Sequence, residues 1–268
     1  MKRILCRVAG SAMLALGLAA CGGGGGGGGD SKSADSSGGS GGAGYTTVAA
    51  SIAGVTPSTI KSDYYEGAQP TSYTTFNGSA KGDLSVLNGK TLYVILEDPD
   101  GLFAPNPSAF VSGSSLTLNA VNQVKKPGTY KGSLNIYACL DAGCTVRLGN
   151  VPYPIPYDVR VRSNLAFDAN ASTTIAATAA YSASGQTVSL KIRPPEGRPV
   201  SDLQFLYSNS YLGFQASITD NGDGSGMLNV QVPAAKVRNH YALSYLIEAA
   251  PGIPPVPPKT LNVNLDIQ

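Results

Sequence analysis

The side chains that could act as a base, a nucleophile or a paired acid are few and scattered along this chain. His240 is the one histidine, so a Ser-His-Asp triad has a single candidate base, and no Gly-x-Ser-x-Gly elbow between a predicted strand and a helix supplies its nucleophile. We therefore predict a surface or strand-edge histidine. The glutamates stand in no recognisable motif: Glu66, Glu97, Glu196 and Glu248. Since the fold, and not sequence spacing, pairs the carboxylates of glycosidases, a hydrolase with an unfamiliar site stays an open alternative.

Two acidic loops could be mistaken for calcium sites. In the segment 220–226, Gly222 and Gly224 stand where an EF-hand loop needs its second and third ligands, so a glycine-rich hairpin loop is the better prediction. The segment Glu97-Asp98-Pro99-Asp100-Gly101 follows a predicted strand, Leu92–Leu96, and turn formation accounts for its composition. We expect no metal site, no cofactor and no catalytic residue, with calcium at an acidic loop as the alternative.

The start of the chain has the composition of a secretory signal. Lys2, Arg3 and Arg7 precede a mostly apolar stretch, residues 8–20, of 13 residues, which is too short to span a bilayer as a helix. An ordinary cleaved signal, or an apolar helix retained in the membrane, would also fit this pattern.

The segment Leu18-Ala19-Ala20-Cys21 resembles the bacterial lipobox. The resemblance implies that residues 1–20 are a signal peptide removed by cleavage and that Cys21 becomes acylated. It also implies an outer-membrane lipoprotein, because Gly22 and not aspartate follows the cysteine. Which face of the outer membrane the protein occupies stays open.

A flexible tether follows the predicted anchor. Residues 22–44 contain only Gly, Ser, Ala, Asp and Lys, a composition with nothing to bury and much backbone entropy to lose on ordering. Together with Cys21 they form the predicted segment 21–44. A flexible chain of 23 residues has a root-mean-square reach of about 25–30 Å.

The lipobox resemblance also bears on the other cysteines, because Cys6 would leave with the signal and Cys21 would carry lipid. Cys139 and Cys144 then remain in an oxidising compartment. Their spacing differs from the two intervening residues of thioredoxin-type pairs, and no further Cys or His lies nearby for a metal site. We predict a disulfide that closes the tip of a hairpin, which stabilises the fold by about 2 kcal/mol in the chain-entropy model.

The charge balance excludes a nucleic-acid partner. Lys2, Arg3 and Arg7 precede Cys21, which leaves 16 of the 19 basic residues beside all 17 acidic ones. The net charge of the processed chain is then near −1, and no basic cluster exists to hold phosphates. The charged fraction, 13%, is about half the usual value, and suits an exported β-rich protein.

Alternation of apolar and polar residues predicts β-strands over most of the chain from Tyr45 to Gln268. It is clearest in four segments, 133–139, 157–162, 188–193 and 261–267, and indicates sheets with one buried and one wet face. Turn pairs such as Asn88-Gly89 and Pro127-Gly128 separate the strands. Tyr64, Tyr65 and Tyr73, in a polar and turn-rich stretch, are predicted to pack in a core or interface, with stacking on sugars or peptides as the alternative.

The order of parts repeats once. A strand, a loop, a proline-spaced segment and an alternating strand end both halves of the 224 residues from Tyr45 to Gln268. We expect two domains, residues 45–165 and 166–268, each of ordinary size.

The stretch Gly128–Cys139, followed by Cys144 and Tyr157–Val161, resembles the last strand pair of the immunoglobulin-like domains of bacterial exported lipoproteins. The Gly-x-Tyr opening of this stretch, which ends at Tyr130, is similar to a tyrosine corner. The resemblance implies an all-β fold of two tandem immunoglobulin-like antiparallel β-sandwiches. No tryptophan is present to complete the Cys–Trp–Cys pattern of antibody domains.

These observations predict a lipid-anchored envelope protein that acts as a non-catalytic binding, adhesion or spacer module. Its partners would be the membrane, through the lipid, and an unidentified protein or glycan. An envelope assembly or accessory factor is the first alternative, and the hydrolase named above is the second.

Acylation of Cys21 can be tested directly. Metabolic labelling with a clickable fatty acid is expected to mark the wild-type protein and to leave the Cys21→Ser variant unlabelled, because serine offers no thiol to the acyl donor. Label retained by the variant would refute the assignment.

Overall fold

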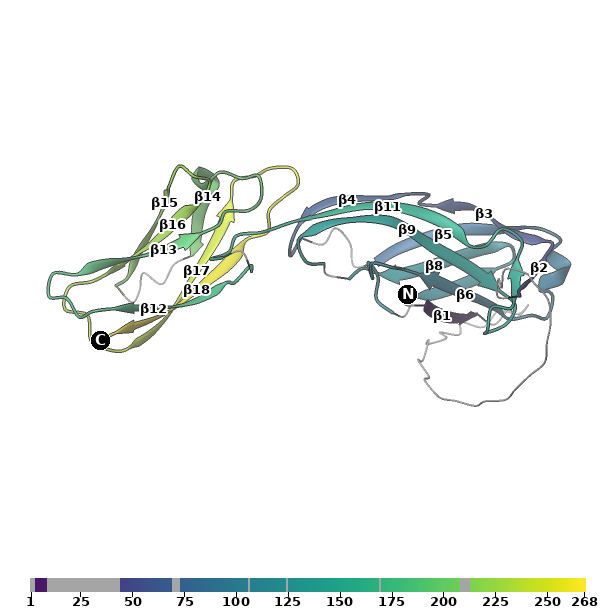
Figure 1. Cartoon of the computed structure of the whole chain (residues 1–268), viewed down its shortest axis with the longest axis horizontal. Helices are drawn as coiled ribbons and strands as arrows, with labels where there is room; N and C mark the ends of the chain where they lie inside the picture. The colour runs from purple at the N-terminus through teal and green to yellow at the C-terminus, as the bar shows by residue number, and fades with distance from the viewer. Residues whose placement is uncertain are drawn as a thin grey trace, which may run out of the picture. The chain divides into compact units, whose positions relative to one another are not determined.

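The computed structural model describes residues 3–8, 44–68, 73–105, 107–123, 125–168, 170–207 and 213–268, and for residues 3–8 it gives only the course of the backbone. Almost every regular element in these ranges is a strand (Figure 1). Within the same ranges no helix is long and apolar enough to cross a membrane.

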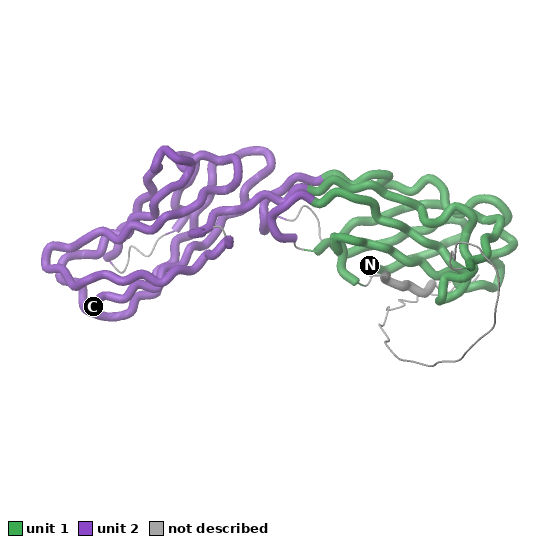
Figure 2. The backbone as a smooth tube through the Cα atoms, in the orientation of Figure 1, with its two compact units in different colours: residues 1–61, 71–123, 130–159 green, residues 62–70, 124–129, 160–268 purple. Residues whose placement is uncertain are grey.

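The chain divides into two compact units (Figure 2). Unit 1 comprises residues 1–61, 71–123 and 130–159, and unit 2 comprises residues 62–70, 124–129 and 160–268. The division after Val159 falls six residues before the boundary expected from the sequence. Two strands, β4 and β11, begin in unit 1 and end in unit 2.

Two sheets make up the first half of the fold. The elements there are β1 (Arg3–Val8), β2 (Thr46–Val48), β3 (Ala50–Thr56), β4 (Ile60–Tyr65), β5 (Tyr73–Gly82), the 3-10 turn η1 (Leu84–Leu87), β6 (Leu92–Glu97), β7 (Ser108–Ser112), β8 (Ser115–Val121), β9 (Gly128–Cys139), β10 (Val146–Leu148) and β11 (Tyr153–Arg162). One sheet has the order β3-β5-β8-β7. In the other, β9 pairs with β6, β10 and β11, β11 also pairs with β4, and β1 and β2 lie at the ends.

Unit 2 contains two further sheets. Its elements are β12 (Thr174–Ala179), β13 (Gln186–Ile192), the 3-10 turn η2 (Val200–Asp202), β14 (Leu203–Tyr207), β15 (Gln215–Asp220), β16 (Gly226–Val232), β17 (His240–Ala249) and β18 (Lys259–Ile267). The sheets have the orders β12-β18-β17-β14 and β13-β16-β15. All pairs are antiparallel except β12 with β18, which is parallel.

Both halves share the strand order of an immunoglobulin-like sandwich. In immunoglobulin lettering, β5, β8 and β7 correspond to B, E and D, and β6, β9 and β11 correspond to C, F and G. The same letters fit β13, β16 and β15 and then β14, β17 and β18. The predicted fold class, all-β with two tandem immunoglobulin-like sandwiches, is confirmed.

Period-two burial explains why these sequences form two-faced sheets. In β18 the apolar residues Leu261, Val263, Leu265 and Ile267 are buried, and the residues between them are at least partly exposed. In unit 2 these side chains join buried residues of β13, β16 and β17 in one core. A one-residue slip in register would expose the whole apolar set, so the pattern fixes the pairing.

The two proline-spaced segments have different structures. The segment 253–258 precedes β18 and lies outside any strand. In contrast, β11 already begins at Tyr153 and includes Pro154 and Pro156, whose side chains are exposed. The alternation of the strand thus starts four residues before the point that the sequence predicts.

Tyr245 of β17 is the largest polar side chain in the core of unit 2. It is fully buried, and its ring packs edge-on against Phe205 with the centroids 5.9 Å apart. Its hydroxyl has no hydrogen-bond partner among the described residues. Burial raises the pKa of this hydroxyl to about 12. A buried and unpaired hydroxyl weakens the fold, because water solvates it in the unfolded chain.

We therefore expect Tyr245→Phe to leave the free energy of unfolding unchanged or to raise it by up to about 1 kcal/mol. Tyr245→Ala, which also removes the ring, should lower it by about 3–5 kcal/mol. Urea unfolding of the two variants beside the wild type measures both effects. A loss of more than about 1 kcal/mol in the phenylalanine variant would contradict the prediction.

Candidate functional site

The disulfide predicted from the sequence is present. Cys139, the last residue of β9, is bonded to Cys144, with the two Cα atoms 5.0 Å apart. The bond closes the turn before β10, whose Arg147 pairs with Cys139. Cys21, the other cysteine singled out above, lies outside the described residues, so its acylation stays a prediction.

Asp141 holds the disulfide loop, residues 139–147, in shape. Its carboxylate accepts the backbone N–H groups of Thr145 at 3.0 Å and Val146 at 2.6 Å. These bonds hold the pKa of Asp141 below its ordinary value, the bond from Thr145 having the larger effect. Cys144, at φ 56°, takes the left-handed conformation that the tight turn requires. A half-buried acidic residue is therefore a structural part of the loop.

An arginine stacks between tyrosines beside this loop. The guanidinium of Arg147 lies 4.2 Å from the ring centroid of Tyr45 and 5.3 Å from that of Tyr137, and its Nε donates to the carbonyl of Cys144 at 2.9 Å. Tyr45 is half exposed. Such a stack presents a flat, partly cationic surface that suits binding and offers no nucleophile.

The acidic segment 97–101 is more than the turn predicted for it. Asp98 is almost completely buried. Its Oδ2 accepts the N–H of Phe103 at 2.8 Å, and its backbone carbonyl accepts the N–H of Gly101 at 3.3 Å. Its Oδ1 has no hydrogen-bond partner among the described residues. The sequence predicted the turn correctly but missed the burial of this carboxylate.

The neighbouring carboxylates contact different groups. Glu97 accepts hydrogen bonds from Asn135 and Tyr137, both at 3.1 Å. Asp100 accepts the hydroxyl of Tyr157 at 2.7 Å, and burial, followed by this bond, raises the pKa of that hydroxyl. Among the residues that the structure describes, no three His, Cys, Asp or Glu side chains are grouped so that they could hold a metal ion.

The glycine-rich segment 220–226 is the hairpin loop that the sequence predicts, between β15 and β16. Asp220 accepts the N–H of Gly222, and Asp223 accepts the N–H of Ser225, both at 2.8 Å. Each aspartate thus caps its own turn.

His240 opens β17 and faces Asp266 across the ladder. Its Nδ1 lies 3.1 Å from Asp266 Oδ1, and its side chain is 85% exposed. The predicted surface position of this histidine is confirmed.

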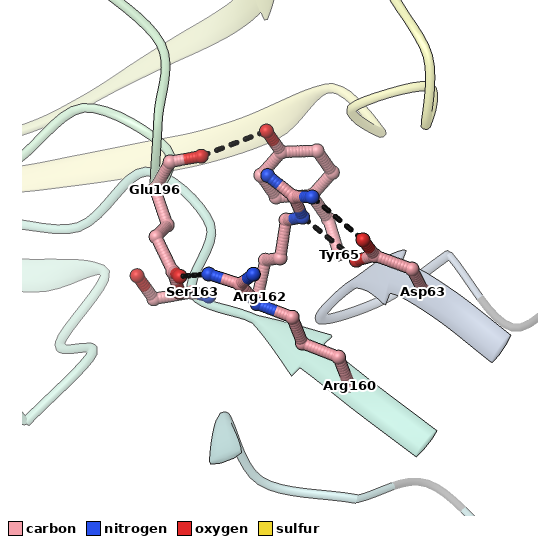
Figure 3. Close-up of polar contacts among 6 residues, drawn as sticks. All are labelled: Asp63, Tyr65, Arg160, Arg162, Ser163 and Glu196. Atoms are coloured by element: carbon pink, nitrogen blue, oxygen red, sulfur yellow. Dashed lines mark hydrogen bonds and ion pairs between the residues drawn. The ribbon is translucent and has the colours of Figure 1, made fainter. Parts of the chain in front are cut away.

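A connected set of charged contacts among the described residues belongs to unit 2 and was not predicted from the sequence. We call it the arginine cluster (Figure 3), and it comprises Asp63, Tyr65, Arg160, Arg162, Ser163 and Glu196. Arg162 donates from Nε and Nη2 to the two oxygens of Asp63 at 2.7 and 2.6 Å. This fork-to-fork pairing is the strongest geometry available to an arginine and a carboxylate.

Glu196 joins the other members of the arginine cluster. Its Oε1 accepts from Arg160 Nη2 at 2.5 Å, and its Oε2 accepts the backbone N–H of Ser163 at 3.3 Å. Its own backbone carbonyl accepts the hydroxyl of Tyr65 at 2.8 Å. Glu196, which lies between β13 and β14, thereby links the end of β4 to the end of β11 through hydrogen bonds.

The electrostatics of the arginine cluster keep both acids ionised. The hydrogen bond from Arg162 holds the pKa of Asp63 below its ordinary value of 3.8. The hydrogen bond from Arg160 likewise lowers the pKa of Glu196. A general acid needs the opposite shift, towards neutral pH, so the arrangement is suited to holding backbone segments together.

The tyrosines lie on strands, which corrects the turn-rich interpretation of their surroundings. Tyr64 and Tyr65 belong to β4 and Tyr73 begins β5. Tyr65 is buried, which confirms a core position, whereas Tyr73 is 56% exposed.

Comparison with known proteins does not assign a family. No family model matches the chain, and no curated protein matches it.

Several solved structures match the chain at low similarity. One is the endo-fucoidan hydrolase MfFcnA4 of glycoside hydrolase family 107, with 9% identity over 78% of this chain and 27% of that one and a TM-score of 0.27. Another is InvD of Yersinia pseudotuberculosis, with 12% identity over 82% and 58% and a TM-score of 0.26.

The cadherin-like domains 1 to 4 of zebrafish RET match with 10% identity over 84% of this chain and 52% of that one, at a TM-score of 0.28. The chain thus spans less than two thirds of each of these structures. At such values the likenesses carry no argument about activity or partner.

The Arg162–Asp63 pair gives a prediction about pH. Because the pKa of folded Asp63 is lowered, its contribution to stability is present above the unfolded pKa, about 3.9, and is lost as the pH falls through the folded value. In Arg162→Lys, which keeps the charge and loses the fork, the carboxyl pKa of Asp63 should rise towards 3.8.

Carbon-detected NMR titration of the aspartate carboxyls measures this shift. Lys191→Arg, a conservative change of a cation near the unrelated Asp223, serves as the control and should leave Asp63 unmoved. An unchanged pKa of Asp63 in Arg162→Lys would show that the fork does not set it.

Proposed function

We propose that this chain is an envelope lipoprotein, anchored to the outer membrane through acylated Cys21, whose two immunoglobulin-like units act as a non-catalytic binding, adhesion or spacer module. The lipobox-like segment 18–21 and the glycine-rich tether that follows support the anchor. The two sandwiches support the binding role, because a rigid sandwich presents loops and strand edges to a partner.

One observation carries the non-catalytic part of the proposal. Four carboxylates that could do acid–base chemistry make contacts that hold the fold: Asp63 and Glu196 accept from arginines, Glu97 accepts from Asn135 and Tyr137, and Oδ2 of Asp98 accepts from the backbone of Phe103. Catalysis by these groups would require breaking the contacts that position the strands.

The length of the proposed tether is compatible with a lipid anchor that carries two sandwiches. A tether of 23 residues separates the lipid from the first described strand of the mature chain, and gives a freely moving module a root-mean-square reach of about 25–30 Å from the bilayer. A role as an envelope assembly factor would use the same arrangement, and a hydrolase is the alternative of a different class.

A substrate screen separates the binding module from the hydrolase. The chain from Gly22 to Gln268 is incubated with ester, glycoside and peptide substrates, and we expect no turnover above the buffer rate. Reproducible turnover that is abolished by His240→Ala, Asp98→Asn or Asp100→Asn would contradict the proposal. Thermal melting of each variant distinguishes a lost site from a lost fold.

A further inference from the structure

The first strand of the structure lies in the segment that the proposed processing removes. β1, Arg3–Val8, pairs antiparallel with all six residues of β6 in one uninterrupted register, from Arg3 opposite Glu97 to Val8 opposite Leu92. β1 also lies next to β7, an edge strand of the opposing sheet. The segment therefore contacts both β6 of its own sheet and β7 of the opposing sheet.

Removal of residues 1–20 would leave β6 as the last strand of its sheet. β6 would then present a row of unpaired backbone N–H and C=O groups, together with the side chains that β1 now adjoins. Natural edge strands usually carry a protective device such as a bulge, a proline or an outward charge.

Two other edge strands of this protein, β3 and β14, have such a device, and β6 has none. The pairing of β3 is interrupted by a register shift between Ala53 and Thr56. β14, the counterpart of β6 in unit 2, has a shift between Phe205 and Tyr207. In contrast, β6 contains no proline, glycine or lysine, and its one charged residue, Glu97, is bonded to Asn135 and Tyr137 of its own sheet.

The sequence of residues 22–44, which follows the proposed cleavage site, offers no replacement for β1. Residues 22–44 consist of Gly, Ser, Ala, Asp and Lys, and alanine is the largest apolar side chain among them. They therefore lack the alternating large apolar groups that a strand at the edge of a sandwich needs. A second copy of β6 fits less well than β1, because antiparallel self-pairing over these six residues would place Leu92 opposite Glu97 where β1 has Arg3.

We propose that the β6 edge of the processed protein is a strand-accepting site, which pairs antiparallel with an extended segment of a partner protein. The register of β1 defines the chemistry of that segment: a basic residue opposite Glu97, followed by apolar residues opposite Leu96, Ile95 and Val94. This inference rests on the proposed function, since it requires the signal to be removed. Addition of a strand at a sheet edge is an established mode of peptide recognition, in which main-chain hydrogen bonds supply affinity.

The probe is a fluorescent peptide of residues 2–9 carrying Cys6→Ser, which stands in for the partner segment. Its binding to the chain from Gly22 to Gln268 is followed by fluorescence anisotropy, and amide hydrogen exchange locates the site. We expect saturable binding and protection of amides in β6.

Two N-methylated peptides form the matched control. In one, alternate residues from Arg3 are methylated at the backbone nitrogen, and in the other the pattern begins at Ile4. Since only every second N–H of an edge strand points to its neighbour, one peptide should lose about tenfold or more in affinity and the other should keep most of it. Equal losses in both would overturn strand addition.

Charge tests the register. A peptide with Arg3→Glu should bind several-fold more weakly, because like charges directly opposite each other are unfavourable. The chain variant Glu97→Gln, which keeps its hydrogen-bonding capacity, should reduce that difference. An unchanged difference would show that the basic residue does not face Glu97.

The remaining outcomes are also decisive. No binding by the peptide, in a protein whose Cys21 is shown to be acylated, would overturn the inference and leave the proposed function intact. A mature protein that still begins with residues 1–20 would overturn the premise of both. Concentration-dependent dimers with protected β6 amides in the absence of peptide would assign the edge to a second copy instead.

Discussion

The larger sheet of each half is organised around the last strand of that half. β11 pairs with β9 on one side and β4 on the other, and β18 pairs with β17 and β12. From Ile155 in β11 and from Leu261 in β18, every second residue is hydrophobic and buried. A single strand therefore fixes both the register of two neighbours and the face that they turn to the core. The other strands of each sheet extend outward from this paired centre.

The positions of two arginines are also set by β11. Arg160 and Arg162 stand on the polar face of β11, because the alternate positions, Val159 and Val161, are buried. The arginines therefore point away from the core, towards carboxylates brought by β4 and by the segment after β13. The burial pattern of one strand thus positions the main ion pairs of unit 2.

The sequence was sufficient for features that depend on near neighbours in the chain. Alternation predicted most strands, and glycine and aspartate predicted the loop 220–226. The lipobox resemblance left Cys139 and Cys144 as a pair in an oxidising compartment, which led to the disulfide. The sequence was insufficient where partners are far apart: Arg162 and Asp63 are 99 residues apart, and Arg160 and Glu196 are 36 apart. Alternation indicated that these arginines face outward, but only the folded sheet order selects the carboxylate that each meets. The burial of Asp98 also escaped prediction, since its turn sequence is typical of exposed loops.

The short span of the disulfide has a consequence for the order of events during folding. Only five positions separate Cys139 from Cys144, and the turn between them is shaped by Asp141, a residue of the same loop. Closure of the bond requires this local turn and none of the distant strands, and it can precede the arrival of β11, which follows it in the chain. A formed Cys139–Cys144 bond therefore shows that this one turn has closed. It gives no information on whether the surrounding domain has reached its native packing.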